Sequence, residues 1–147
     1  MKLKRREMCA MLPAVAIPAA LANAMGADEA KVLPSEMFPF EKMIARKGAV
    51  AEIRSVMKGK LATSESIEVH QTTLAPGGMP HPPHRHIHSE MWLIREGTVE
   101  LTVEGKSTQM GPGSVGFVHS NDEHGIKNVG NAPATYFVVA IGPGVAG

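Results

Sequence analysis

Short runs of alternating apolar and polar residues dominate the chain from Ala51 onward. In Thr98–Glu104 the residues Val99, Leu101 and Val103 alternate with polar neighbours, which is the pattern of a strand with one buried face. Turn residues separate the runs, as at Glu104-Gly105-Lys106. The pattern predicts eight strands: Ala51–Met57, Ser66–Leu74, Met91–Arg95, Thr98–Glu104, Ser107–Met110, Val115–Val118, His124–Asn128 and Thr135–Ile141.

Eight short strands with closely spaced turns predict an all-β fold closed into a barrel or jelly roll, because closure leaves no exposed sheet edge. A two-sheet sandwich without a site is the alternative. The length of 147 residues suits one domain, and 15 Gly and 11 Pro disfavour a helical bundle. We expect this barrel domain over residues 50–147. A mobile lead-in over residues 25–49 lacks periodicity, and we expect it to dock through Phe38 and Phe40.

An export signal is predicted for residues 1–24. Four basic residues precede the weakly apolar stretch Ala10–Ala22, which is too short to span a bilayer. Ala22-Asn23-Ala24 then supplies a small-x-small cleavage pattern. Arg5-Arg6 resembles a twin-arginine signal, with an ordinary secretory signal and a non-cleaved anchor as alternatives. We expect a periplasmic or secreted protein with no stable membrane anchor after cleavage.

Removal of residues 1–24 changes the charge and the cysteine content of the chain. The formal net charge falls from +1 to −2, since 11 Lys and Arg remain against 13 Asp and Glu. This leaves no basic field for nucleic acid and no polybasic membrane patch. The single cysteine, Cys9, is also removed, so no disulfide can form within the remaining chain.

Six of the seven histidines lie between positions 81 and 124. His84 and His86 are two residues apart, so on an extended backbone their imidazoles point to one face, and Glu90 follows at an even offset. Imidazole and carboxylate are suitable ligands for Fe, Mn, Ni, Cu or Zn. These three residues predict one half of a metal site, in which open positions would admit water or substrate.

The spacing of these residues resembles the first motif of the cupin superfamily. The motif reads Gly78, five residues, His84-Arg85-His86, three residues, Glu90, six residues, Gly97. The second motif is matched in spacing by Gly113, His124 and Asn128, but His119 stands where that motif usually has Pro and Asn121 where it usually has Gly.

The resemblance implies a cupin-type barrel, or double-stranded β-helix, over nearly all of residues 50–142. It also implies one divalent transition metal, of unknown identity among Fe, Mn, Ni, Cu and Zn, held by His84, His86, Glu90 and His124. His124 enters this ligand set only through the resemblance and the clustering of histidines. A barrel that keeps these ligands but works empty, or binds metal weakly, is the alternative.

Strand parity extends the candidate site to an expected pocket. Trp92 and Ile94 share a face with Glu90, so we expect them to form an apolar wall near the metal; plain core is the alternative for Trp92. Phe117 and His119 share a face on the next strand. If that face lines the barrel, Phe117 belongs to the pocket and His119 orients a ligand or acts as a general base beside Glu90. A capping contact at a loop is the alternative for His119.

The remaining histidines receive smaller roles. On a straight strand His88 points to the same face as Glu90, which would place it in the pocket with a supporting or acid–base role. A solvated position at the rim is the alternative. His81 lies in a Pro-rich entry and is expected at the rim. His70 is expected to be a satisfied core residue outside the metal set, and Arg95 is expected to point outward.

These features leave three functional hypotheses. The first is an exported, mononuclear metal-dependent enzyme that acts on a small oxygenated organic molecule, by dioxygenase-like oxidation or as an isomerase or lyase. The second is a non-catalytic module that binds a small molecule or a metal. The third is a structural barrel acting through dimer formation. A homodimer is expected in any case, because exposed cupin sheet faces commonly pair.

Overall fold

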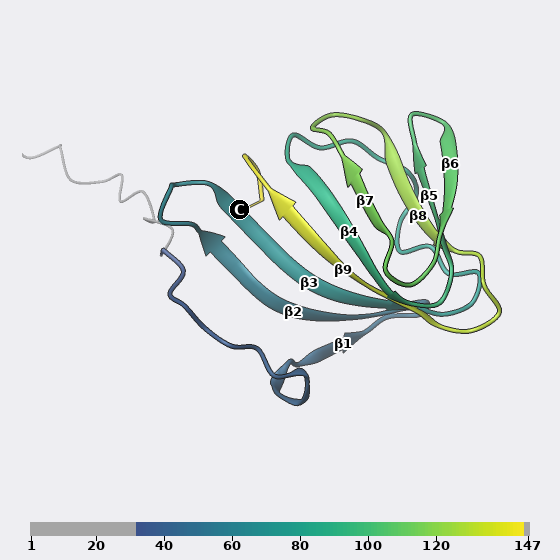
Figure 1. Ribbon diagram of the computed structural model, residues 1–147, viewed down its shortest axis with the longest axis horizontal. Helices are drawn as coiled ribbons and strands as arrows, with labels where there is room; N and C mark the ends of the chain where they lie inside the picture. Colours follow the sequence, from purple (N-terminus) through teal and green to yellow (C-terminus); the bar gives the residue numbers. More distant parts are fainter. Residues whose placement is uncertain (1–31, 146–147) are drawn as a thin grey trace, which may run out of the picture.

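The computed structural model describes residues 32–145, and the predicted export signal and the start of the lead-in lie outside these residues. Strands make up nearly all of the regular structure (Figure 1), which confirms the all-β prediction. The elements are the 3-10 helix η1 (Phe40–Lys42) and the strands β1 (Ala45–Lys47), β2 (Ala51–Lys60), β3 (Ser66–Leu74), β4 (Ser89–Glu96), β5 (Val99–Val103), β6 (Lys106–Met110), β7 (Val115–Val118), β8 (His124–Asn128) and β9 (Ala134–Ile141). No helix among the described residues is long and apolar enough to cross a membrane.

The nine strands form two sheets that face each other as a jelly roll. The larger sheet has the order β1-β2-β3-β9-β4-β7, and the smaller has the order β6-β5-β8. Figure 1 shows the larger sheet as a long curved surface with the smaller sheet at one end. All named strand pairs are antiparallel, and β3 pairs with β9 in unbroken register from Ile67↔Ile141 to Leu74↔Ala134. The order follows the chain only in part, so distant segments become neighbours.

The strand bounds agree closely with the sequence pattern, with one omission. Strands β3, β7 and β8 have the predicted ends, and β2 extends three residues further, to Lys60. Strand β1 was not predicted, because three residues are too few to show alternation; it pairs with β2 from within the lead-in. Within the lead-in, the centroid of the Phe40 ring lies 4.6 Å from the Arg54 guanidinium carbon, and Phe40 is 51% exposed.

The core lies between the two sheets. Trp92 and Ile94 of β4 pack there with Tyr136 and Val138 of β9 and Leu101 of β5. Burial of such apolar area stabilises the fold by roughly 25 cal/mol per Å². Gly116 of β7 also faces inward, since a Cβ built on it would lie 2.6 Å from Leu101 Cδ2.

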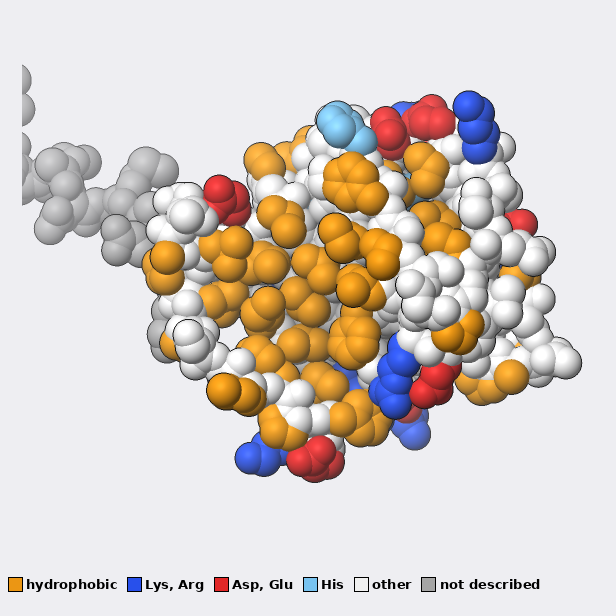
Figure 2. Space-filling model, in the orientation of Figure 1, with side chains coloured by type: hydrophobic (Ala, Val, Ile, Leu, Met, Phe, Trp, Pro, Cys, Tyr) orange, Lys and Arg blue, Asp and Glu red, His pale blue; other side chains and the backbone are white. Residues whose placement is uncertain are grey.

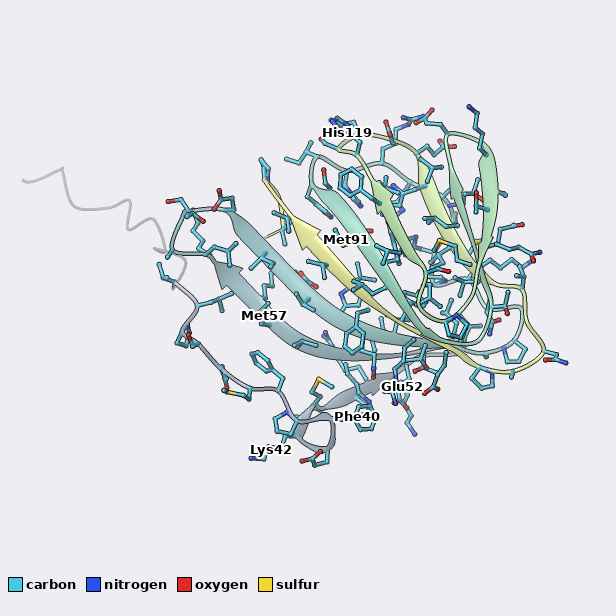
Figure 3. All side chains as sticks on the ribbon, in the orientation of Figure 1. Phe40, Lys42, Glu52, Met57, Met91 and His119 are labelled. Atoms are coloured by element: carbon cyan, nitrogen blue, oxygen red, sulfur yellow. The ribbon has the colours of Figure 1, made fainter. Side chains whose placement is uncertain are left out.

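The outer face of the larger sheet is unusually apolar. Met91 pairs with Phe117 on one side and with Val139 on the other, and Leu93 pairs with Val115. Directly paired residues share a face of a sheet, so these side chains form one outward surface, and Phe117 is 61% exposed. Figure 2 shows hydrophobic side chains gathered over this sheet, and Figure 3 places Met91 on it.

This arrangement corrects the conditional prediction that Phe117 and His119 line the barrel. The inward positions of β7 are Gly116 and Val118, because Gly116 pairs with Trp92 and Val118 with Glu90. Phe117 therefore lies on the outer face. His119 follows β7 at an exposed position (Figure 3), where its Nδ1 bonds the Ser120 carbonyl at 2.8 Å. Neither side chain belongs to the interior cavity.

Candidate metal centre

Three histidines from two distant segments meet inside the barrel. His84 and His86 precede β4, and His124 begins β8. His84 and His124 form an isolated antiparallel bridge with two backbone hydrogen bonds of 3.0 Å. One potential ligand atom from each of the three lies within 4.8 Å of the others. The fold thus brings together the two halves that the sequence analysis joined only through the family resemblance.

Three histidine nitrogens can each donate a lone pair to a cation. His84 Nδ1, His86 Nε2 and His124 Nε2 are buried and have no hydrogen-bond partner among the described residues. The other nitrogens of two rings are occupied, since His86 Nδ1 lies 2.9 Å from the His88 carbonyl and His124 Nδ1 lies 2.8 Å from the Asp122 carbonyl. A carbonyl only accepts, so Nδ1 carries the proton in both rings and Nε2 presents its lone pair. These residues fit a divalent transition metal.

Glu90 completes the set from β4. Its Oε1 lies 3.3 Å from His86 Nε2, and its Oε2 lies 3.6 Å from His124 Nε2. Burial acts to raise the pKa of Glu90, but the nearby His124, His86 and His88 side chains outweigh burial and hold that pKa below its usual value. The site therefore offers an ionised carboxylate at neutral pH, which metal binding requires.

Burial and neighbouring groups shift the pKa values of His84 and His124. Burial lowers the pKa of His84, and the neighbouring His81, His124 and His86 lower it further. For His124 burial also acts to lower the pKa, but the nearby Glu90 carboxylate and the Asp122 carbonyl reverse the direction and raise it. His84 is thus readily neutral, whereas protonation of His124, which Glu90 favours, competes with metal binding at that ring.

A cavity of about 220 Å³ opens beside Glu90 and His124. Its apolar lining includes Trp92, Ile126 and Tyr136, and the Trp92 ring lies 5.5 Å from that of His124. Trp92 therefore forms the predicted pocket wall while also belonging to the core. Ile94 does not line this cavity and lies in the core alone. His81 is exposed near the opening, and its ring lies 4.2 Å from that of His84.

The sequence analysis missed polar residues of the cavity wall on β3. His70 and Thr72 both line the cavity, although His70 was expected to be a satisfied core residue. The alternation of β3 carried the signal, because His70, Thr72 and Leu74 share a face. That face turns from core to cavity along the strand, and strand parity alone does not locate this change.

A second cavity, of about 280 Å³, lies on the other side of the Glu90 carboxylate. Lys58, Glu68, His70 and His88 line it together with Glu90. His70 and Glu90 thus border both cavities. The first cavity is mainly apolar and the second carries charged groups, so the interior offers two different surroundings to a bound molecule.

A pH test follows from His70. Burial lowers its pKa from 6.5, with Arg46 acting in the same direction and Glu68 and Glu90 acting against it. The unfolded chain therefore binds a proton at this position before the folded protein does, and the free energy of unfolding falls as the pH drops below about 6.5. His70→Gln should reduce the loss of stability of the metal-free protein between pH 7.5 and 5.5, measured by urea unfolding. An unchanged pH dependence would contradict this assignment.

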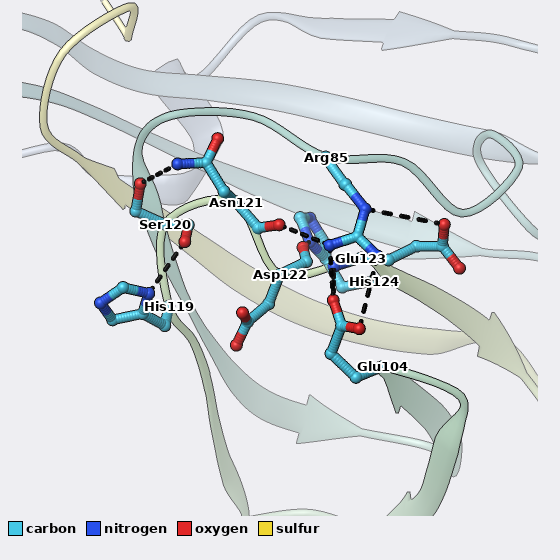
Figure 4. Close-up of polar contacts among 8 residues, drawn as sticks. All are labelled: Arg85, Glu104, His119, Ser120, Asn121, Asp122, Glu123 and His124. Atoms are coloured by element: carbon cyan, nitrogen blue, oxygen red, sulfur yellow. Dashed lines mark hydrogen bonds and ion pairs between the residues drawn. The ribbon is translucent and has the colours of Figure 1, made fainter.

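Arg85 connects the two ligand-bearing segments from the outside (Figure 4). Its Nη1 donates to Glu104 Oε1 at 2.6 Å and to the Asn121 carbonyl at 2.7 Å. Glu104 Oε1 also accepts from the Glu123 amide at 2.7 Å, and the Asn121 amide donates to the His86 carbonyl at 2.8 Å. Asn121 has φ +67°, a conformation that glycine adopts readily and asparagine tolerates. This φ explains why the family motif usually has Gly there.

We therefore predict that Arg85→Met weakens metal binding by about tenfold, the scale seen when groups that orient ligands are removed. Stability should change little, because exposed ion pairs contribute little to folding. Arg95→Met is the matched control, since the Arg95–Glu96 pair is similarly exposed but lies away from the ligands. Calorimetric metal titration of both variants measures the difference. Equal affinities in the two variants would show that Arg85 does not position the ligands.

Comparison with known proteins agrees with this geometry. Residues 70–140 match the model of the cupin domain. L-ectoine synthase from Bordetella petrii is 36% identical over 56 residues, which is 37% of this chain and 42% of that protein. The match therefore spans less than half the length of this curated relative.

Solved structures share the fold at low sequence identity. An RmlC-like cupin from Shewanella frigidimarina superimposes with a TM-score of 0.61 at 19% identity, covering 73% of this chain and 91% of that chain. KdgF from Halomonas sp. superimposes with a TM-score of 0.63 at 14% identity, covering 73% and 94%. The sequence of residues 70–140 and the jelly-roll fold are therefore similar to those of cupin domains.

Proposed function

We propose that the protein is a mononuclear metal-dependent enzyme acting on a small oxygenated organic molecule. The observation that carries the proposal is the convergence of three unpartnered, buried imidazole nitrogens beside Glu90 at the wall of a cavity. His84, His86, Glu90 and His124 would hold the metal. When bound, a divalent transition metal polarises oxygen ligands of a substrate and, with a redox-active metal, supports oxidation.

The chain's own residues supply binding, orientation and proton control. The apolar wall formed by Trp92, Ile126 and Tyr136 holds the carbon skeleton and excludes water. Glu90 lies within 3.6 Å of two histidine nitrogens and can hold a proton when an acidic substrate binds. These roles suit dioxygenase-like oxidation as well as isomerase or lyase reactions, since both begin with an oxygenated molecule held at a metal.

Turnover assays on the metal-loaded protein test the proposal. Protein loaded separately with Fe, Mn, Ni, Cu and Zn is mixed with catechol, flavonol and diketone substrates, and dioxygen uptake and product formation are followed. L-ectoine formation belongs in the panel because of the partial likeness to L-ectoine synthases. Turnover that depends on metal and is lost in His84→Gln is expected. Tight ligand binding without turnover under every condition would instead support the non-catalytic binding module.

Export is part of the proposal and rests on the sequence of residues 1–24. A twin-arginine signal would carry a protein that has folded and bound its metal before transport. Replacing Arg5-Arg6 by Lys-Lys should therefore stop export of the protein in a bacterial host. Continued export would favour the ordinary secretory signal, and retention of the unmodified protein in the cytoplasm would contradict export altogether.

We further propose that two copies pair through the apolar outer face of the larger sheet. Met91, Leu93, Val115 and Phe117 form an exposed apolar surface, and apolar patches of this kind are uncommon on monomers. Sedimentation equilibrium should give twice the chain mass, and Phe117→Glu should shift the protein toward monomer. A monomeric mass for the unmodified protein at all concentrations would contradict the pairing.

A further inference from the structure

The first cavity follows the strands away from the candidate metal centre. Glu90 of β4 pairs with Ala140 of β9, and the next inward residues of these strands, Trp92 and Val138, also pair. Two residues before Val138, Tyr136 faces inward and lines the same cavity as Glu90. At about 3.4 Å per residue, the backbone of Tyr136 lies roughly 13 Å along the strand from that of Ala140. The cavity therefore has a metal-binding end at Glu90 and a far end at Tyr136.

The far end of the cavity carries two hydroxyl groups. Thr72 of β3 pairs directly with Tyr136, and both side chains line the cavity. Thr72 is 2% exposed and Tyr136 is 1% exposed. Their other strand partners are Ile53 on β2 and Ile94 on β4. Across these four strands, a polar pair thus stands between two apolar side chains.

The two hydroxyl groups keep a hydrogen for a bound molecule. A buried hydroxyl in apolar surroundings costs free energy unless it forms a hydrogen bond, and valine and phenylalanine would fill the same positions without that cost. Two hydroxyl groups bring two hydrogens, and a hydrogen bond between them uses only one. The other hydrogen can bond an oxygen atom of a molecule in the cavity.

The charge of the far end favours a neutral oxygen. In the described part of the chain, the residues that line this cavity include no lysine or arginine. Burial raises the pKa of Tyr136, so its hydroxyl is protonated at neutral pH. A carboxylate buried without a cation costs far more free energy than a neutral group. An alcohol or carbonyl oxygen is therefore the group that fits beside Thr72 and Tyr136.

We propose that Thr72 and Tyr136 form a subsite for a neutral oxygen at the end of the substrate opposite its metal-binding oxygens. The inference rests on the proposed metal-dependent function and names the class of substrate, a compact molecule with two oxygenated ends and an apolar middle. Trp92 and Val138 lie between the two ends of the cavity and pack against that middle. The volume of about 220 Å³ is below that of drug-sized pockets, so the substrate contains a single small ring or a chain of similar size.

Two chelating pyranones are a matched pair of probes for this subsite. Kojic acid and allomaltol bind metals through the same two adjacent oxygens. They differ only on the opposite side of the ring, where kojic acid has a hydroxymethyl group and allomaltol a methyl group. The protein is loaded with Zn²⁺, which undergoes no redox reaction, and titrated with each probe by calorimetry. We expect kojic acid to bind about 3- to 10-fold more tightly than allomaltol, the scale of one net hydrogen bond.

Removal of the hydroxyl groups should remove this preference. We expect Tyr136→Phe and Thr72→Val each to lower the ratio of the two affinities, and the double variant to bring it to about one. Zn²⁺ affinity should not change, because neither residue belongs to the ligand set. Thr73→Val is the matched control and should keep the preference, since Thr73 lies on the opposite face of β3, where its hydroxyl lies 3.0 Å from that of Thr135.

The outcomes separate the subsite from the metal centre. Equal affinities of the two probes for the unmodified protein, or a preference that persists in both single variants, would overturn the subsite. Binding of Zn²⁺ without binding of either probe would also overturn it and leave the metal centre in place. Failure of the unmodified protein to bind Zn²⁺ would overturn both. Circular dichroism confirms that each variant is folded, and the single variants suffice for the test if the double variant does not fold.

Discussion

His124→Gln should abolish stoichiometric metal binding and with it the stabilisation that metal provides. His124 is 2% exposed, its Nε2 is unpartnered, and its Nδ1 is fixed by the Asp122 carbonyl. A ligand that binds only the folded state at 100 times its dissociation constant stabilises a protein by about 2.7 kcal/mol. We expect the unmodified protein to gain stability of this order on metal addition, measured by urea unfolding, and His124→Gln to gain none.

Two further variants make this prediction specific. His84→Gln changes a less buried ligand and should give the same loss even if His124→Gln impairs folding. His119→Gln should retain the full metal effect, because the exposed His119 side chain lies outside the ligand set and contacts the neighbouring Ser120 carbonyl. Metal-dependent stabilisation that persists in both ligand variants would place the bound metal elsewhere on the chain.

Gly97→Ala should cause a large loss of stability. Gly97 has φ +79°, and a Cβ built on it would lie 2.6 Å from Ala134 Cα and 2.7 Å from the Pro133 carbonyl oxygen. An alanine there combines an unfavourable backbone conformation, roughly 1–2 kcal/mol, with overpacking against backbone, roughly 1–3 kcal/mol. We expect the free energy of unfolding to fall by about 2–5 kcal/mol in urea titrations.

Gly105→Ala is the control that separates the cost of the backbone conformation from the cost of the steric clash. Gly105 has φ +74°, but nothing lies within 4 Å of a Cβ built on it. Its substitution should lower the free energy of unfolding by only about 1–2 kcal/mol, from backbone conformation alone. Equal losses of unfolding free energy in the two variants would show that β9 shifts to accommodate the Cβ added at residue 97. The close approach of Gly97 to Ala134 would then not be a packing constraint.

The sequence predicted most strands because their apolar positions alternate and glycine or proline ends each run. Strand β3 shows this in its first half, where the buried Ile67, Val69 and Gln71 alternate with the partly buried Glu68 and His70. Three of the ligands were also accessible from parity, because His84, His86 and Glu90 lie at even offsets. Strand β1 escaped prediction, because its three residues are too few to show alternation.

The positions missed in the site depend on which strands become neighbours. Phe117 and Trp92 are equally apolar in sequence terms, yet the pairing of Gly116 with Trp92 turns Phe117 outward. His70 lies beside two cavities rather than within the core. Alternation gives two faces for each strand, and only the register between strands decides which face meets the metal centre.

Metal analysis of the purified protein tests the central claim most directly. The protein is purified without added chelator, its metal content is measured by elemental analysis, and the chelator-treated protein is then titrated with Fe, Mn, Ni, Cu and Zn. We expect about one bound transition metal per chain, lost in His84→Gln and His124→Gln. No binding of any of these metals at micromolar concentration would contradict it.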